Sequence, residues 1–387
     1  MNVFLADPYL MNEAGHCFPY MDSLRRQLAK SGVTSIILGN RAATPAFLEA
    51  MNVEGAFRSS IRGRWWEMPL IGARFAANLS TITQQYALDQ NSLLIINSLW
   101  HFHLGAVARW LEALPAERRP RVALILHFTA RRGPPQEVRE AIAAYRKAFQ
   151  RLAGLERTGH VRVWADTTEL VEEFSALTDL PIGLAPVPPT FASQDRLPKS
   201  PQAPVRIVFA GEARVEKGFA LLPSALSALR QRSGRAFEFI VQAFTPRRET
   251  PDFRAARVAL RQGGAHLVEH SLMLEDYACA LAEADIVLTP YLAPHYRYQS
   301  SGVFVDALIS GCVTIAPAGT WMGNQIEKSG GGLIFKPNDA EDLGRVLGAA
   351  LDRFDDLSTQ ARRNADAARA FYNTETLVTQ LLSDWPA

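Results

Sequence analysis

The chain has 387 residues, of which 48% are hydrophobic and 21% are charged, and its formal net charge is +2. This length and composition predict a globular protein with two domains, each with its own core. So small a net charge, without a block of lysines and arginines, argues against nucleic-acid binding. No apolar run approaches the roughly 20 residues of a membrane-spanning helix, and the start lacks a basic leader, so we expect a cytoplasmic protein.

Strand-like and helix-like segments alternate along the first half, which is typical of parallel sheets built from βα units. Apolar runs predict strands near Val3, Ile36, Leu93, Val122 and Val163. Between them, amphipathic patterns predict helices over residues 18–29, 67–87, 104–114, 137–152 and 167–177. We therefore expect a doubly wound α/β domain.

A Pro-rich stretch over residues 185–204 continues neither a strand nor a helix. The second half then repeats the pattern, with strands predicted in VRIVFAG, FEFIVQA, HLVEH, DIVLTP, VTIAP and GLIF. We expect a first domain over residues 1–190, a linker over 191–204 and a second domain over 205–370. Residues 371–387 are expected to form a helix that crosses back to the first domain.

The three cysteines, Cys17, Cys279 and Cys312, lie far apart and form no CxxC pair or zinc-ligand pattern. We expect all three cysteines to be reduced and to lie in the core.

The segment over residues 205–222, VRIVFAGEARVEKGFALL, carries the strongest functional signal. It reads as a buried strand, a turn at Gly211, two cations at Arg214 and Lys217, and a helix that begins at Gly218. Unpaired N–H groups and the helix dipole favour an anion at a helix start. The segment therefore predicts a phosphate or diphosphate site. The alternative is a surface turn whose cations are solvated.

These residues, with the block over 285–321, resemble the glycosyltransferases of the GT-B fold. Within that fold they resemble family 4, glycosyltransferase group 1, which includes phosphatidylinositol mannosyltransferases and glycogen synthases. The resemblance implies two Rossmann-like doubly wound domains facing across a cleft, with the acceptor on the first domain and the nucleotide sugar on the second. In the family an arginine and a Lys-Gly pair hold the donor diphosphate. Lys217 matches the lysine, whereas Glu212 stands at the arginine position and Arg214 is the nearest guanidinium.

Two glutamates eight positions apart contact the sugar hydroxyls and the ribose in the family. Tyr298 occupies the first position, and Asp306 fits the second because a carboxylate accepts hydrogen bonds from vicinal ribose hydroxyls. Ser300, Ser301 and Gly302 are expected to form the turn into the next helix and to hold the distal phosphate with their backbone N–H groups. As an alternative, Ser300 is simply a helix N-cap.

The segment APAGTWMGNQIEKSGGGLIF resembles a Gly-rich loop of the family, with Gln325 where a glutamate is usual. The resemblance places Gly319 and Thr320 near the transferred sugar, since glycine allows positive φ and close backbone approach. An ordinary strand-to-helix loop is the alternative.

Candidate acid–base groups lie in the first domain. Glu13 and His16 belong to a loop after the first strand that resembles the family's donor and acceptor loop. His127 ends the strand VALILH and matches a histidine that often closes this strand in the family, so we expect it to point into the cleft; a structural histidine is the alternative. His101 and His103 lack a third metal ligand nearby, and we interpret them as acceptor-site or loop residues.

The sequence contains no Asp-x-Asp pair, the motif with which sugar transferases of the other common fold bind a metal ion. We therefore expect no metal and no cofactor, with Arg214, Lys217 and the helix start at Ser300 neutralising the leaving diphosphate. The expected reaction is transfer of a sugar from a nucleoside diphosphate sugar to an acceptor hydroxyl. The resemblance implies retention of the anomeric configuration, and an inverting course would require one of the acid–base groups as a base.

The acceptor is expected to be a glycan, a lipid-linked molecule or a small molecule. Residues 61–79, IRGRWWEMPLIGARFAANL, mix arginine with tryptophan and methionine as a helix on a membrane surface does, which implies peripheral association with the inner membrane face. Core tryptophans and solvated arginines are the alternative. Arg131 and Arg132 offer another contact for a phosphate or an acidic glycan.

Other function classes stay open. Tyr298 and Gln325 in place of carboxylates suit a catalytically idle module that binds a sugar nucleotide or a partner protein. A sugar-nucleotide epimerase is a second alternative. A nicotinamide-dependent dehydrogenase is disfavoured because no GxGxxG follows the first strand.

Overall fold

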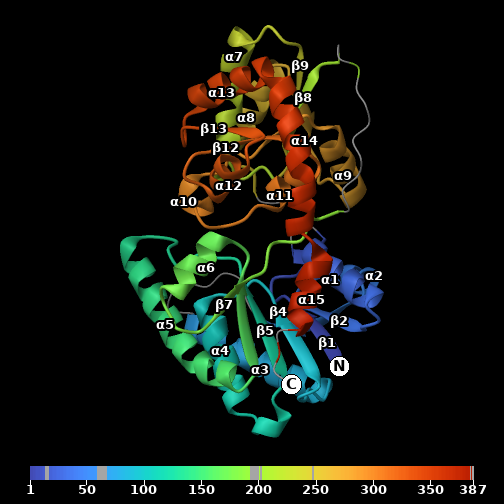
Figure 1. Ribbon diagram of the computed structural model, residues 1–387, viewed down its shortest axis with the longest axis vertical. Coiled ribbons are helices and arrows are strands. Elements are labelled where there is room, and N and C mark those ends of the chain that lie inside the picture. Colours follow the sequence, from blue (N-terminus) through green and yellow to red (C-terminus); the bar gives the residue numbers. More distant parts are fainter. Residues whose placement is uncertain are drawn as a thin grey trace. The chain divides into compact units, whose positions relative to one another are not determined.

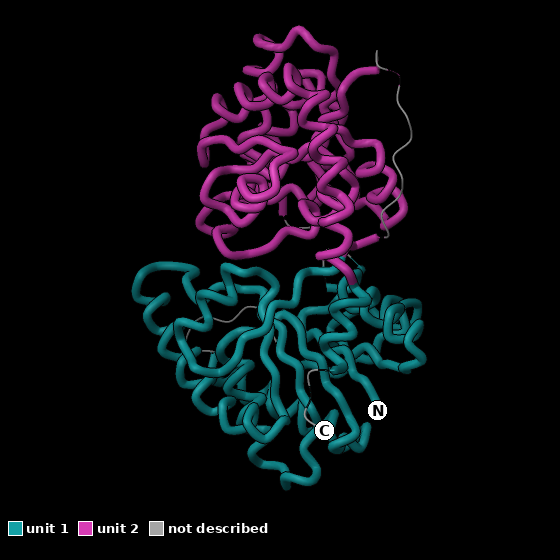
Figure 2. The backbone as a smooth tube through the Cα atoms, viewed as in Figure 1, with its two compact units in different colours: residues 1–188, 374–387 teal, residues 189–373 magenta. Residues whose placement is uncertain are grey.

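A computed structural model describes residues 1–13, 17–58, 68–191, 200, 203–245, 248–383 and 385. The chain divides into two compact units (Figure 2): unit 1 comprises residues 1–188 and 374–387, and unit 2 comprises residues 189–373. Most of the predicted linker, residues 191–204, lies outside the described residues.

Unit 1 is built on a seven-stranded sheet in the order β3-β2-β1-β4-β5-β6-β7, and all the pairings are parallel. Its central strands are continuous apolar runs, as expected where helices cover both faces of a sheet; every residue of β4 is buried. The strands are β1 (Asn2–Ala6), β2 (Ser35–Asn40), β3 (Val53–Phe57), β4 (Ser92–Ile96), β5 (Arg121–Leu126), β6 (Val161–Ala165) and β7 (Ile182–Leu184).

Helices lie on both faces of this sheet (Figure 1). The described α-helices of unit 1 are α1 (Cys17–Lys30), α2 (Pro45–Ala50), α3 (Met68–Gln85), α4 (His101–Glu112), α5 (Pro135–Arg157), α6 (Thr168–Ser175) and α15 (Thr374–Ser383). A 3-10 turn, η2, spans Ala116–Arg118. Helix α15 comes from the last part of the chain, and its Leu377, Val378 and Leu381 share one core cluster with Leu24 and Leu28 of α1.

Unit 2 contains a six-stranded sheet in the order β10-β9-β8-β11-β12-β13, also parallel throughout. Its strands are β8 (Val205–Phe209), β9 (Phe237–Gln242), β10 (His266–Val268), β11 (Ile286–Leu288), β12 (Val313–Pro317) and β13 (Gly332–Phe335). Its described helices are the 3-10 turns η3 (Val215–Lys217) and η4 (Phe219–Leu221), followed by α7 (Leu222–Arg232), α8 (Pro251–Gln262), α9 (Leu274–Glu283), α10 (Ala293–Tyr296), α11 (Gly302–Ile309), α12 (Trp321–Ser329), α13 (Ala340–Asp352) and α14 (Phe354–Phe371).

The strand order reverses at the first strand of each sheet, between β1 and β4 in unit 1 and between β8 and β11 in unit 2. Ligands of open α/β sheets bind outside the carboxyl ends of the strands at such a switch point. The residues that follow these strands include Asp7 and Asn97 in unit 1 and Gly211 and Tyr291 in unit 2. A ligand-binding site is therefore expected at one or both of these places.

The doubly wound α/β fold is confirmed, and each of the six strands predicted in the second half is present. Helix α2 and the edge strands β3 and β7 were not predicted from the sequence. Strand β7 has three residues and contains Gly183, which is required because a Cβ there would lie 2.5 Å from Trp164 Cδ1. A strand so short, with a glycine at its centre, does not show an alternating or continuous apolar pattern.

Two further expectations are wrong. Gly218 does not open a long helix: its φ of 72° joins the 3-10 turns η3 and η4, and α7 begins at Leu222. Cys279 is exposed on α9 rather than buried in the core, Cys17 is half-buried, and Cys312 is buried as expected.

Candidate functional site

The turn after β8 makes room for a lysine ammonium group. Gly211 has a φ of 90°, and its N–H donates to Gln242 Oε1 over 2.6 Å. A Cβ on Gly211 would lie 2.9 Å from Lys217 Nζ and 3.4 Å from Val303 Cγ2. Glycine is therefore needed here, and Lys217 and the first turn of α11 flank the same point of the backbone.

A second glycine fixes the loop that carries Lys217. Gly218 packs so closely on the residues after β11 that a Cβ would lie 2.0 Å from the carbonyl oxygen of Pro290. The N–H of Leu292 donates to the Glu216 carbonyl over 2.9 Å in the same region. These contacts join the loops after β8 and β11 at the switch point of unit 2.

Lys217 is half-buried, and its charge is poorly compensated. Burial, and then the nearby Arg214, lower the pKa of Lys217 to about 7. Its ammonium lies 5.5 Å from the centre of the Tyr291 ring. Among the described residues no carboxylate forms an ion pair with Lys217. Glu212 and Glu216 lie 3.6 and 3.5 Å from Arg214, and their charges only partly offset the fall in the pKa of Lys217. An anionic ligand would supply the missing countercharge.

The start of α11 supplies backbone donors next to this ammonium. Ser301 is the N-cap, and its hydroxyl accepts from Phe304 N over 3.3 Å. The cap is thus Ser301 and not Ser300. The N–H groups of Gly302 and Val303 have no acceptor within the helix, as at every helix start. Lys217, Ser301 and Gly302, three of the predicted phosphate ligands, lie in one region of unit 2.

The residues predicted to contact the sugar and the ribose are less favourably placed to meet a ligand than the predicted phosphate ligands. Asp306 and Thr320 are each 0% exposed. The Thr320 hydroxyl donates to the Pro317 carbonyl over 2.7 Å and accepts from Gly323 N over 3.1 Å, so it caps α12. Gly319, by contrast, has a φ of 70° and open space at the Cβ position. Tyr298 is half-buried under the guanidinium of Arg297, 5.6 Å from the ring centre.

At the switch point of unit 1, a fully buried aspartate accepts hydrogen bonds from several groups, including the Cys17 thiol. Asp7 Oδ1 accepts from Tyr9 N over 2.8 Å, and Oδ2 accepts from Ser98 Oγ over 2.8 Å and from Asn97 Nδ2 over 3.2 Å. Burial raises the pKa of Asp7, and the hydrogen bonds oppose that rise. Ser98 adopts a φ of 59°, a conformation that strains a residue other than glycine and that often occurs at functional sites.

His127 belongs to the same network and is 5% exposed. Its Nδ1 lies 2.8 Å from Asp166 Oδ2, and its Nε2 is hydrogen-bonded to Asn97 Oδ1. The network thus joins the ends of β1, β4, β5 and β6. Because both ring nitrogens are engaged, His127 holds the network together in this arrangement, which matches its alternative interpretation as a structural histidine.

The two other predicted acid–base groups follow β1 in the sequence. Glu13 is exposed, and His16 lies outside the described residues. His103 is buried; burial is the main cause that lowers its pKa to about 3, and its Nδ1 accepts from Trp100 N over 3.1 Å. His101 is half-buried, and burial lowers its pKa to about 4.

Sequence analysis missed a stacked aromatic pair at this edge of unit 1. The rings of Trp100 and Phe128 lie 4.6 Å apart at 8°, and both residues are half-buried. Each follows one of the neighbouring strands β4 and β5, and that position in the sequence could have drawn attention to them. Exposed aromatic faces suit the apolar face of a sugar ring.

A buried glutamate shapes the loop that carries Arg131. Glu173 of α6 accepts from Thr129 Oγ1 over 2.7 Å and from Ala130 N over 3.0 Å. Burial raises the pKa of Glu173. Arg131 Nε lies 3.8 Å from this carboxylate, while 48% of the arginine side chain is exposed. Arg131 and Arg132 therefore remain at the surface of unit 1.

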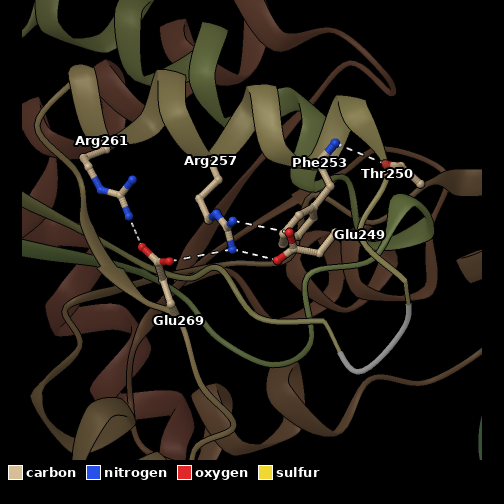
Figure 3. Close-up of polar contacts among 6 residues, drawn as sticks. All are labelled: Glu249, Thr250, Phe253, Arg257, Arg261 and Glu269. Carbon is tan, nitrogen blue, oxygen red and sulfur yellow. Dashed lines mark hydrogen bonds and ion pairs between the residues drawn. The ribbon is translucent and has the colours of Figure 1, made fainter.

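An open depression of about 590 Å³ lies at the start of α8 and is lined by Arg248, Glu249, Thr250, Pro251 and Arg254. Figure 3 shows Arg257 between Glu249 and Glu269, with its Nη1 2.7 Å from Glu249 Oε1 and 3.6 Å from Glu269 Oε2. Arg261 also pairs with Glu269. These ion pairs connect Glu249 and Glu269 to helix α8. The depression contains none of the residues around Lys217.

The described ranges contain no cluster of three or more His, Cys, Asp or Glu side chains arranged to hold a metal ion. None of the described helices is both long and apolar enough to cross a membrane. Arg62, Arg64, Trp65 and Trp66 of the suggested surface helix lie outside the described residues.

No protein-family model and no curated protein matches the sequence. Solved structures do resemble the chain. Sucrose-phosphate synthase from Thermosynechococcus elongatus aligns with a TM-score of 0.69 at 12% identity, over 98% of this chain and 97% of that one. HepE from Anabaena in complex with UDP gives 0.68 at 13% identity, over 98% of each chain. An α,α-trehalose-phosphate synthase (UDP-forming) from Burkholderia xenovorans, in complex with glucose-6-phosphate, gives 0.65 at 12%, over 99% of each chain. The likeness shows the GT-B fold.

Proposed function

We propose that this protein is a glycosyltransferase that moves a sugar from a nucleoside diphosphate sugar to an acceptor hydroxyl. The observation that carries the proposal is Lys217, a half-buried ammonium without a described ionic partner, beside the first turn of α11 at the switch point of a GT-B domain. A diphosphate in this place would meet both the ammonium and the N–H groups of Gly302 and Val303.

These residues would act on the leaving group. Negative charge grows on the diphosphate as the glycosidic bond breaks, and preorganised donors stabilise that charge in the transition state. Lys217 and the start of α11 are held in place by Gly211, Gly218 and the Ser301 cap, so they need little rearrangement. Arg214 lies near Lys217 but is paired with Glu212 and Glu216, and it would support the site by orienting the loop. The proposal needs no metal ion.

Uridine diphosphate (UDP) is the first donor nucleotide to test, because the names of two similar structures include it. Membership of family 4, and with it a retaining reaction, forms part of the proposal. The acceptor, a glycan or a lipid-linked molecule, would lie on unit 1 near Trp100 and Phe128. Under a retaining course, Asp7, Asn97 and His127 would serve to hold this edge rigid.

Two observations favour an idle sugar-nucleotide-binding module. Tyr298 replaces a family carboxylate, and Asp306 is buried instead of facing the surface. Such a module would bind UDP but would leave a UDP-sugar intact, even with an acceptor present.

The test is to measure UDP release from a panel of UDP-sugars by the wild type, Lys217→Ala and the control Lys336→Ala. Lys336 is a lysine of the same unit, 75% exposed and 3.6 Å from Asp339. We expect turnover by the wild type and by the control, and a loss of about 10²–10³-fold in kcat for Lys217→Ala, as for removal of other charge-stabilising donors. Binding without release in the wild type would support the idle module. Equal rates in the three proteins would contradict the role of Lys217.

A further inference from the structure

Asp306 occupies the position at which the family resemblance implies a ribose ligand, yet the fold uses its carboxylate internally. The residue lies on α11 and is 0% exposed. Its Oδ1 accepts from the backbone N–H of Thr190 over 2.9 Å, and its Oδ2 accepts from Tyr277 OH over 2.9 Å. The Thr190 hydroxyl also bonds to this carboxylate. Both oxygens are therefore engaged within unit 2.

Asp306 and its two hydrogen-bond partners come from segments far apart in the sequence. Thr190 lies at the beginning of unit 2, Tyr277 on α9 and Asp306 on α11. The Phe191 ring packs edge-on against Tyr277 with centroids 5.9 Å apart. Phe191 and Tyr277 also pack on an apolar cluster that includes Ala307, the neighbour of Asp306. Asp306 thus joins the first residues of unit 2 to two of its helices.

A swing of Asp306 towards a nucleotide would break these contacts. It would leave the Thr190 N–H and the Tyr277 hydroxyl without their acceptor, and an unsatisfied buried donor is costly. Burial raises the pKa of Asp306 to about 6, and the hydrogen bonds from Thr190 and Tyr277 oppose that rise. The carboxylate is therefore better suited to hold the backbone than to exchange partners with a ligand.

Thr190 connects this anchor to the proposed donor site. A Cβ on Gly302 would lie 3.9 Å from Thr190 Oγ1, so the threonine side chain lies beside the first turn of α11. We propose that Asp306 is a positioning residue, which holds Thr190 against the start of α11, and is not a ligand of the donor ribose. Its effect on the reaction would pass through Thr190 and α11, and this part of the inference rests on the proposed function.

The first experiment needs no ligand. Pro186, Pro188 and Pro189 have no amide hydrogen, so hydrogen exchange in the peptide over residues 186–191 reports few sites, including Thr190. In Asp306→Ala, which removes both acceptor oxygens, we expect exchange at Thr190 to be at least tenfold faster than in the wild type. Tyr277→Phe, which keeps the ring, is expected to cause a smaller increase. Unchanged exchange at Thr190 in Asp306→Ala would overturn the anchor.

The second experiment separates anchoring from ribose binding. UDP and 2′-deoxy-UDP are titrated into the wild type and Asp306→Ala, and the ratio of the two Kd values is compared. If Asp306 is an anchor, the variant weakens both nucleotides by the same factor and the ratio is unchanged. A ratio that falls to about one in the variant would assign Asp306 to the ribose and overturn the inference.

Asp306→Glu provides a rescue test with the family's own side chain. A ribose ligand would tolerate the longer carboxylate, whereas an anchor at a fully buried site has no room for another methylene group. We therefore expect Asp306→Glu to show faster exchange at Thr190 than the wild type, as Asp306→Ala does, and wild-type exchange together with wild-type UDP affinity would contradict us. If the wild type binds neither nucleotide, the proposed function fails, while the exchange experiment still decides the anchor.

Discussion

Lys217 shows how a single residue links folding, pH and ligand binding. Its folded-state pKa of about 7 lies below the ordinary value of 10.5, so the unfolded chain holds this proton more tightly than the folded one. The buried charge lowers the free energy of unfolding by its full amount below about pH 7, and this loss declines as the pH rises from 7 towards 10.5. A bound diphosphate would reverse this balance, because it favours the charged lysine.

Affinity for UDP should therefore fall at alkaline pH. Between pH 7.5 and 9 we expect the wild type to lose affinity by up to about tenfold per pH unit, since binding must then take up a proton. Lys217→Arg is the matched control, because a guanidinium stays charged over this range. Isothermal titration calorimetry at several pH values measures both proteins. Parallel pH profiles would show that Lys217 does not meet the diphosphate.

Residues of the candidate site differ in how far the sequence predicts them. Lys217 and Gly302 follow strands at the carboxyl edge of a parallel sheet, and that position can be inferred from local patterns. The internal role of Asp306 depends on Thr190, which is 116 positions away, and no local pattern reports such a contact. The His127 network likewise joins the ends of four strands and becomes visible only in three dimensions.

At the level of elements, central strands were predictable because buried parallel strands are continuous apolar runs. The edge strand β7 is short and contains Gly183, so its signal is weak. The 3-10 turns before α7 were missed because Gly218 resembles a helix start, whereas its backbone serves the close approach of Pro290.

The start of α12 gives a test at this scale. Thr320→Ala removes the cap of α12 and the bond to the Pro317 carbonyl, and we expect a loss of about 1–2 kcal/mol in the free energy of unfolding. Thr320→Ser keeps the hydroxyl and removes only a buried methyl group, at a cost of about 0.8 kcal/mol, so it should lose less than Thr320→Ala. Urea denaturation measures both variants. Equal losses in the two would mean that the methyl group of Thr320, and not its hydroxyl, stabilises the helix.

At the scale of the whole molecule, each unit has its own sheet and core, and each is expected to unfold cooperatively. Leu381 of α15 and Leu347 of α13 are both fully buried, the first in unit 1 and the second in unit 2. Truncation of either to alanine should cost about 2–5 kcal/mol in its own unit.

Differential scanning calorimetry distinguishes the two substitutions. Leu381→Ala should lower the melting temperature of one transition and Leu347→Ala that of the other. A single transition that shifts equally in both variants would show that the units unfold together.

The position of α15 also sets an order of events during synthesis. Leu377, Val378 and Leu381 complete the core of unit 1, although they are translated after the whole of unit 2. The amino-terminal part of the chain therefore lacks the cover of residues 374–383 until the whole of unit 2 has been made, whereas unit 2 is made from one continuous stretch. Molecular chaperones would be expected to bind the earlier half of the nascent chain.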